Sequence, residues 1–242
     1  GQSNGWARCR LRRESPALYA RYMAATLPLF PLGSVLFPGV VLPLHIFEPR
    51  YRKMIADLQE LPEGESRQFG VVAIRDGREV GAQSVESVYD VGCTARISAL
   101  EAHEDGRYSV VTTGVQRFRL LDVDTAGPYL VGEVEFLNEK SDERAETLKT
   151  SSTALLLSYQ RALAGLRGVR PGPIPELPDD PTVLSYLIAA AMVLDLRDKQ
   201  RLLATPDTAA RLQHEQALLR RETMLIKELR TLPAVDLLRR DR

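Results

Sequence analysis

Apolar and polar side chains alternate with a period of two through much of the first half of the chain. Between residues 89 and 100 every second side chain is apolar, which predicts a strand with one face in a core. Similar runs lie at 69–74, 108–113, 115–122 and 129–137, with turn signals such as Asp76-Gly77 and Gly127-Pro128 between them. Gly114 marks a candidate bulge. The pattern predicts a mostly antiparallel, barrel-like β domain.

Five prolines interrupt the strand-forming residues of segment 27–51. Proline has no N–H to donate, so a strand that contains it belongs at a sheet edge, a bulge or a bend. Pro38-Gly39 predicts a tight turn between two strands. Pro49 is typical of the first residue of a helix, and an apolar stripe with helical spacing starts at Tyr51 and predicts a helix that ends near Glu60.

The second half of the chain has helical periodicity. The period lengthens to about 3.6 residues from Ser141 onward. Asp180-Pro181 and Thr205-Pro206-Asp207 each combine a capping residue with proline, which predicts two helix starts. We therefore expect a barrel over residues 23–138, a helical bundle over 139–233 and a frayed tail over 234–242. Residues 1–22 are expected to be disordered or an upstream extension, with a native start at Met23; an arginine-rich transit peptide is the alternative.

Composition narrows the classes of partner. Lys+Arg and Asp+Glu both number 32, so no net field attracts nucleic acid or an anionic membrane. The longest strongly apolar run without charge, 181–194, has 14 residues, whereas a membrane span needs roughly 18 or more. Two cysteines, Cys9 and Cys93, are too few for a disulfide framework. We expect a soluble, cytoplasmic protein without a membrane partner.

The sequence offers no catalytic or metal-binding set. His103 and His214 are each followed by glutamate, but neither has the second histidine of a zinc motif. Cys93 lies on the apolar face of its predicted strand, which favours a buried hydrophobic role over a nucleophilic one. The chain contains no Gly-Lys dipeptide, so the phosphate-binding loop that needs this pair is absent. We expect no cofactor, no metal and no catalytic residue.

Four sequence blocks occur in the order that one protein family uses: LPLFPLGSVLFPGVVLPLHIFEPRYRKMI, SVYDVGCTARI, GVQRFRLL and PYLVGEVEFL. Through them, residues 27–230 resemble the amino-terminal substrate-binding domain of Lon-type ATP-dependent proteases, particularly its stand-alone bacterial versions. The resemblance implies an α+β fold, in which a PUA-like antiparallel β pseudobarrel with one or two helices precedes an α-helical bundle.

The resemblance also implies a binding function. In full Lon proteases this domain helps to capture unfolded or tagged polypeptide, while ATPase and Ser-Lys peptidase domains, which we expect this chain to lack, do the catalysis. We therefore predict a module, not an enzyme, that binds unfolded or exposed apolar polypeptide, with a protease or chaperone as a further partner. The alternative is a PUA-like RNA-binding module, against which the balanced charge and the few aromatic residues weigh.

Four of the candidate peptide-binding residues lie on predicted strands and turns. Phe37, Val40 and Tyr89 are large side chains near turns, where they form either an exposed apolar surface or part of the core. Arg117 is expected to project from the face opposite the apolar one. It belongs there either to a shallow basic patch for acidic peptide or to a solvated face.

The other three candidates mark the corner between strand and helix. Glu48, Arg50 and Tyr51 belong to the motif that carries the resemblance. They either fix the helix through a cap and a salt bridge or face a ligand.

Overall fold

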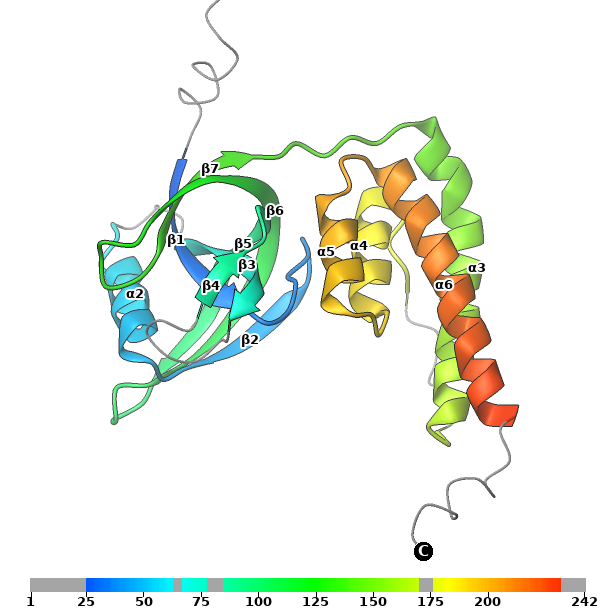
Figure 1. Ribbon diagram of the computed structural model, residues 1–242, viewed down its shortest axis with the longest axis horizontal. Coiled ribbons are helices and arrows are strands. Elements are labelled where there is room, and N and C mark those ends of the chain that lie inside the picture. Colours follow the sequence, from blue (N-terminus) through cyan, green and yellow to red (C-terminus); the bar gives the residue numbers. More distant parts are fainter. Residues whose placement is uncertain (1–24, 63–66, 78–84, 170–175, 232–242) are drawn as a thin grey trace, which may run out of the picture.

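The computed structural model describes residues 25–62, 67–77, 85–169 and 176–231, so the expectations for residues 1–22, for Met23 and for the tail lie outside it. The chain forms a β barrel and a helical bundle that lie side by side (Figure 1). The barrel elements are β1 (Ala25–Leu32), β2 (Val41–Ile46), α2 (Pro49–Gln59), β3 (Gln68–Gly77), β4 (Val85–Val88), β5 (Val91–Ala102), β6 (Tyr108–Asp124) and β7 (Val131–Phe136). The bundle elements are α3 (Glu143–Leu166), α4 (Pro181–Ala191), α5 (Leu196–Ala204) and α6 (Thr208–Thr231).

The sheet closes on itself. Strands pair in the order β1-β7-β6-β5-β3-β4, and β1 also pairs with β3, which completes a ring. The β1–β3 register is parallel and joins residues 29–32 to residues 70–73, whereas the other ladders are antiparallel. Closure removes the free edges of the ring strands and confirms the predicted pseudobarrel. β2 stands outside the ring and, among the described strands, pairs only with β6.

β6 differs from its prediction. The runs 108–113 and 115–122 form one strand, which pairs with β2 and β5 in its first half and with β5 and β7 in its second. Gly114 lies at a register shift against β5, which confirms the bulge. A Cβ at Gly114 would lie 2.2 Å from the carbonyl oxygen of Phe37, so a side chain does not fit there. The predicted turn at Asp76-Gly77 is wrong, because both residues belong to β3 and pair with β4.

α2 covers the barrel core as its apolar stripe predicts. The helix begins at Pro49, and its buried side chains are Tyr51, Met54, Ile55 and Leu58. The ring of Phe30 lies 4.4 Å from the ring of Tyr51 and 5.9 Å from that of Phe69, measured between centroids. Cys93 is fully buried in the same core. Burial raises the pKa of the Cys93 thiol to about 12, which makes it a poor nucleophile.

The bundle helices begin at aspartate caps. The side chains of Asp142, Asp180, Asp195 and Asp207 accept hydrogen bonds from main-chain N–H groups of the first turns of α3, α4, α5 and α6. The start predicted at Asp180-Pro181 is confirmed. α5 was not predicted, because its 9 residues are fewer than the window over which helical periodicity can be recognised. In the described ranges, no helix is both long and apolar enough to cross a bilayer.

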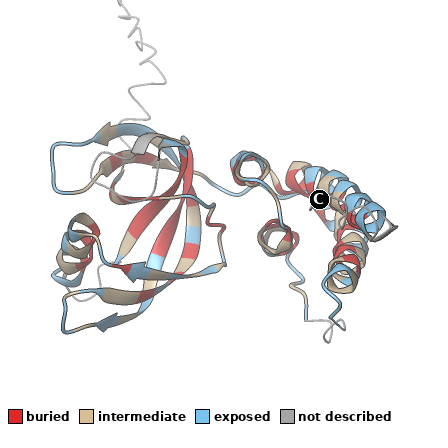
Figure 2. Cartoon of the chain, turned by 60° about the horizontal axis from the view of Figure 1, so that its bottom comes forward, coloured by how far each residue is buried: buried red, intermediate tan, exposed pale blue. Residues whose placement is uncertain are grey.

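The barrel and the bundle share a packed junction. α4 and α5 lie between the barrel and the α3–α6 pair (Figure 1). Buried residues lie on the barrel strands and on the sides of the helices that face one another (Figure 2). One apolar cluster crosses from barrel to bundle, and in it Phe37 and Val91 join residues such as Tyr186. Gln200 of α5 also donates a hydrogen bond to the carbonyl oxygen of Val91 at 2.8 Å.

Arg117 anchors this junction, and its predicted exposure is wrong. Its side chain is 1% exposed and donates to Glu139 Oε1 at 2.6 Å. It also donates to the carbonyl oxygens of Leu203 and Thr205 at 2.9 and 2.8 Å. Buried Arg211 binds the second oxygen of the same Glu139 carboxylate at 3.2 Å. The bundle therefore covers a strand face that the sequence pattern assigned to solvent, and the partners offset the cost of burying the guanidinium.

Glu139 is held in its ionised form at the junction. Burial alone would raise its pKa, but hydrogen bonds from Tyr186 and Arg117 lower the pKa below its ordinary value. Burial, together with the bond to Glu139, raises the pKa of Tyr186, so its hydroxyl keeps the proton that it donates. One carboxylate thus binds two arginines and a tyrosine from three separate elements.

Candidate functional site

A cavity of about 210 Å³ opens between β1 and β2, at the corner where β2 leads into α2. In the described ladders β1 pairs with β7 and β3, and β2 pairs with β6, so the two strands face each other across this cavity without a shared ladder. We call it the β1–β2 seam. It is lined by Phe30, Pro31 and Leu32 of β1, by Pro43, Leu44 and His45 of β2, and by Phe47, Glu48 and Tyr51.

The direction of the main chain explains why β1 leaves the seam open. The N–H of Leu29 donates to the carbonyl oxygen of Leu130 at 2.8 Å, so odd-numbered residues of β1 direct their main-chain groups toward β7. The ladder with β7 ends at Pro28 and is followed by this bond of Leu29, so the next odd-numbered residue after Leu29, Pro31, faces the seam instead. Because proline has no N–H, β1 presents a carbonyl acceptor there and no donor.

β2 has the same property on the opposite side. The N–H of Gly114 donates to the carbonyl oxygen of Val40 at 2.9 Å, so even-numbered residues of β2 direct their main-chain groups toward β6. Odd-numbered residues therefore face the seam, and Pro43 is the central one of them. The two prolines leave the facing edges short of donors, which opposes closure into a ladder. The N–H groups of Val41 and His45 remain directed toward the seam.

Three of the predicted site residues form the corner of the seam. Glu48 is the N-cap residue of α2, yet its side chain makes no capping bond and instead pairs with Arg50 at 3.0 Å. The Arg50 guanidinium lies 4.5 Å from the centroid of the Tyr51 ring. The Tyr51 ring is buried beside the cavity. The expected salt bridge is present, the expected side-chain cap is not, and the corner shapes one wall of the seam.

Phe47 is the seam residue that the sequence analysis missed. It follows β2 directly, lines the cavity and is 49% exposed. Val41, at the start of β2, is 59% exposed. A signal for Phe47 was present in the sequence: Ile46 and Phe47 are adjacent at the end of an alternating strand, so only one of them can face the core. Ile46 does, and Phe47 is left in contact with solvent.

The remaining predicted site residues lie outside the cavity. Phe37 is 1% exposed and packs near Tyr186, so its core alternative holds and its exposed alternative is wrong. Val40 is half-buried and packs against two apolar clusters, the one that crosses from barrel to bundle and the barrel core under α2. Tyr89 is half-buried, and its N–H donates to the carbonyl oxygen of Ala73 at 2.9 Å. Of the seven predicted residues, Glu48 and Tyr51 line the seam.

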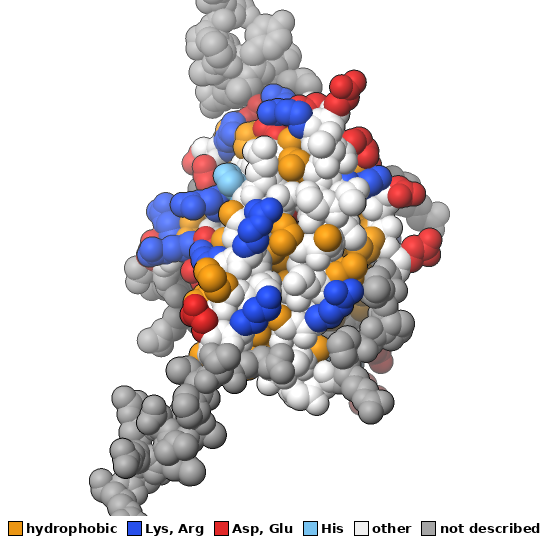
Figure 3. Space-filling view, turned by 90° about the vertical axis from the view of Figure 1, so that its right-hand side faces the viewer, with side chains coloured by type: hydrophobic (Ala, Val, Ile, Leu, Met, Phe, Trp, Pro, Cys, Tyr) orange, Lys and Arg blue, Asp and Glu red, His pale blue; other side chains and the backbone are white. Residues whose placement is uncertain are grey.

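The outer face of the bundle presents a different surface. Lys and Arg side chains stand among hydrophobic ones there (Figure 3). Exposed apolar side chains of the bundle include Val183, Met224, Leu225 and Leu229. Over the residues that the structure describes, no three His, Cys, Asp or Glu side chains gather as a metal site would require. The seam differs because it combines apolar walls with two strand edges.

A closed pseudobarrel and a helical bundle docked on it define an α+β domain. The sequence profile of the ATP-dependent protease La (LON) substrate-binding domain matches residues 26–221. The match covers most of the chain, and the chain therefore belongs to this family, as the four sequence blocks indicated.

Relatives and solved structures agree with this assignment. The Lon protease of Anaeromyxobacter dehalogenans is 30% identical over 210 residues, which are 84% of this chain and 24% of that protein. Lon protease 2 of Myxococcus xanthus is 30% identical over 206 residues, 83% of this chain and 24% of that protein. The chain thus spans about a quarter of the length of these relatives.

The structural neighbours match over nearly their whole length. The Lon N-terminal domain protein from Xanthomonas campestris aligns with a TM-score of 0.59 at 27% identity, over 80% of this chain and 98% of that chain. The N-terminal domain of the Mycobacterium avium complex Lon protease aligns with a TM-score of 0.57 at 20% identity, which shows a shared fold. The α+β fold is confirmed.

Proposed function

We propose that this chain binds unfolded polypeptide, or exposed apolar segments of folded proteins, at the β1–β2 seam. It catalyses no reaction itself in this role and serves as an adaptor to a proteolytic system. The observation that carries the proposal is the seam, where apolar walls meet two strand edges that prolines keep apart. Membership of a substrate-binding family supports polypeptide as the ligand.

Strand addition is the binding mode that the seam favours. An extended peptide can accept hydrogen bonds from the N–H groups of Val41 and His45 and can donate to the carbonyl oxygens of Pro31 and Pro43. Its apolar side chains would contact Phe47 and the cavity walls. Such a site recognises main-chain groups and apolar side chains and does not require a particular sequence. It therefore suits unfolded substrates.

A binding titration tests this function. The probe is a reduced, carboxymethylated and fluorescently labelled protein, which stays unfolded, and binding is followed by fluorescence anisotropy. Phe47→Asp places a charge on the apolar wall and is expected to weaken binding about tenfold or more. The matched control is Val193→Asp, which also places a charge at an exposed apolar position, 61% exposed, but in the bundle. It is expected to leave binding unchanged.

Two results would overturn the proposal. One is equally weak binding of the native and the unfolded probe by the wild-type chain. The other is an equal reduction of binding by Phe47→Asp and Val193→Asp. The adaptor role has its own test: the chain should accelerate degradation of the same unfolded protein by a Lon-type protease, and Phe47→Asp should not. Binding without acceleration would limit the function to polypeptide capture.

A further inference from the structure

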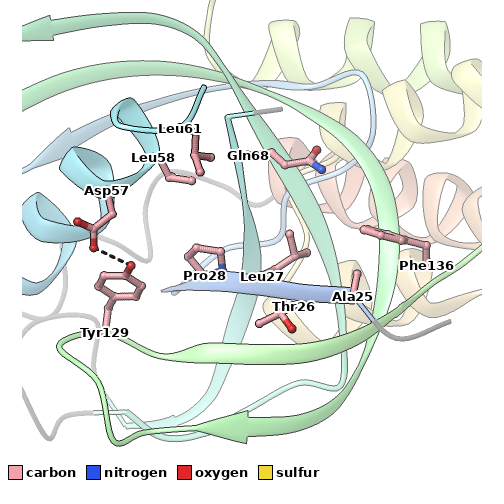
Figure 4. Close-up of a pocket in the computed structure, with 10 residues that line it drawn as sticks. All are labelled: Ala25, Thr26, Leu27, Pro28, Asp57, Leu58, Leu61, Gln68, Tyr129 and Phe136. Carbon is pink, nitrogen blue, oxygen red and sulfur yellow. Dashed lines mark hydrogen bonds between the residues drawn. The ribbon is translucent and has the colours of Figure 1, made fainter. Parts of the chain in front are cut away.

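A second, larger cavity lies at the other end of α2. It has a volume of about 430 Å³ and is bounded by residues 25–28 of β1, by Leu58 of α2, by Leu61 just after that helix and by Phe136 of β7. The side chains of Leu58, Leu61 and Pro28 point toward the same space, and Tyr129 and Asp57 close one side of it (Figure 4). We call this cavity the α2 pocket.

The α2 pocket and the seam lie on the same two elements. Along β1 they use residues 25–28 and 30–32, whose midpoints are separated by about 15 Å at the rise of a strand. At the start of α2, Glu48 and Tyr51 line the seam, and at its end Leu58 and Leu61 line the α2 pocket. The rise of a helix separates the midpoints of these two pairs by about 15 Å as well. The two estimates agree because β1 and α2 run alongside each other in opposite directions (Figure 1).

Besides Thr26 and Gln68, the polar lining of the α2 pocket includes the acceptor oxygens of Tyr129 and Asp57. The Tyr129 hydroxyl donates to Asp57 Oδ2 at 2.9 Å, and Lys53 binds the other oxygen of that carboxylate. Burial and the bond to Asp57 raise the pKa of Tyr129 to about 12, so the phenol keeps its proton and directs it at Asp57. The bonds from Lys53 and Tyr129 lower the pKa of Asp57, which remains a carboxylate. The lone pairs left on these oxygens suit an N–H donor, as peptide main chain supplies.

We infer that the α2 pocket and the β1–β2 seam are two halves of one polypeptide site. Their ligand is an extended segment that carries two bulky apolar side chains four residues apart. The inference rests on the proposed function of the seam and adds the pattern that the substrate must carry. The first apolar side chain fills one cavity and the second fills the other, while main-chain N–H groups meet the acceptors of Tyr129 and Asp57.

The spacing follows from strand geometry. In an extended chain, side chains on the same side recur every second residue. Residues two, four and six apart are therefore separated by about 7, 13 and 20 Å. The separation of about 15 Å along β1 and α2, between the residues that line the two cavities, is nearest to the four-residue spacing. A single apolar side chain can occupy only one cavity, so it should bind more weakly.

A peptide series tests the inference. Labelled peptides of glycine, serine and threonine carry two phenylalanines two, four or six residues apart, and a further peptide carries one phenylalanine. Fluorescence anisotropy with the full chain should show binding about tenfold tighter for the four-residue spacing than for the others. Thr26→Trp fills the α2 pocket from an exposed strand position and should remove this preference, so that the two-phenylalanine peptides bind no more tightly than the single-phenylalanine peptide.

A second variant and a thermal melt guard the experiment against misfolding. Leu61→Asp should act as Thr26→Trp does, and both variants should melt within a few degrees of the wild type. Equal affinity for all spacings, or a preference that survives both variants, would overturn the two-cavity inference while the seam still binds single anchors. Absence of binding by every peptide, with no effect of Phe47→Asp on unfolded protein, would instead overturn the proposed function.

Discussion

Phe37 precedes β2 by a turn, Phe47 follows β2 directly, and the two side chains have opposite surroundings. Phe37 is 1% exposed, because α4 and α5 cover its end of the barrel, whereas Phe47 is 49% exposed at the open corner of the seam. Both are phenylalanines close to prolines, and the burial of Phe37 follows from the packing of the bundle and not from its local sequence. The bundle makes one a structural residue and leaves the other available to a ligand.

Two arginines of β6 show the same contrast between a buried and an exposed side chain. Arg117 and Arg119 are two residues apart and share a strand face by alternation. The side chain of Arg117 is 1% exposed and bonds to Glu139 and to main-chain carbonyls of the bundle. The side chain of Arg119 is 52% exposed and pairs with Glu135 at 3.5 Å. The edge of the barrel surface that the bundle covers therefore lies between Arg117 and Arg119.

The two phenylalanines give the largest predicted difference in stability. Phe37→Ala should lower the free energy of unfolding by about 3 to 4 kcal/mol, because it leaves a cavity in the junction core. Phe47→Ala should change it by less than about 0.5 kcal/mol. Urea denaturation of both variants measures the difference. Equal losses would contradict the assignment of Phe37 to the core and of Phe47 to the surface.

The two glutamates that pair with the β6 arginines form the next test. Glu139→Gln should lower the free energy of unfolding by about 2 to 3 kcal/mol, since it leaves two buried arginines without their shared carboxylate. Glu135→Gln is the matched control at an exposed pair and should cost less than about 1 kcal/mol. If urea midpoints of the two variants coincide, the junction does not depend on the Glu139 carboxylate.

Glu215 supplies a smaller, pH-dependent effect inside the bundle. Its carboxyl is fully buried, neither oxygen has a hydrogen-bond partner among the described residues, and burial raises its pKa well above 4.5 although Arg211 opposes the shift. The unfolded chain ionises this group above about pH 4.5 while the folded chain keeps it neutral. Wild-type stability should therefore fall, relative to Glu215→Gln, as pH rises from 4.5 toward the folded-state pKa.

Thermal melts at about pH 5 and about pH 8 measure this effect, since the stability is expected to fall as the pH rises from the first value to the second. The melting temperature of Glu215→Gln minus that of the wild type should be larger at the higher pH. Glu176→Gln, at an exposed position, should show the same difference at both values. A difference for Glu215→Gln that shrinks with rising pH would contradict a neutral buried carboxyl.

Periodicity and proline placement were enough to predict the barrel, the α2 helix and the bundle. The stripe that begins at Tyr51 and the cap at Asp180 are local signals, and local physics decided both. The shortage of donors along these strand edges was also predictable from the sequence, because Pro31 and Pro43 have no main-chain N–H in any fold. What the pattern did not contain was the position of the bundle.

The incorrect predictions for Arg117 and Phe37 arise because the sequence pattern does not show where the bundle packs on the barrel. Alternation correctly predicted that Arg117 lies on the outer face of its strand. The bundle packs on that face, however, and buries the side chain. Phe37 was treated as a candidate surface residue for the same reason. Phe47 was overlooked, although its position after buried Ile46 leaves it no place in the core. Long-range packing, which one-dimensional patterns do not record, decided the cases of Arg117 and Phe37, whereas local alternation decided that of Phe47.

Amide hydrogen exchange along β2, measured by NMR with and without the unfolded probe protein, tests the seam most directly. The N–H groups of Val41 and His45 face the seam, whereas those of Leu42 and Leu44 face β6. Strand addition predicts that exchange at Val41 and His45 slows at least tenfold when the unfolded protein binds, while exchange at Leu42 and Leu44 is slow in both states. Binding with unchanged exchange at Val41 and His45 would contradict the seam as the polypeptide site.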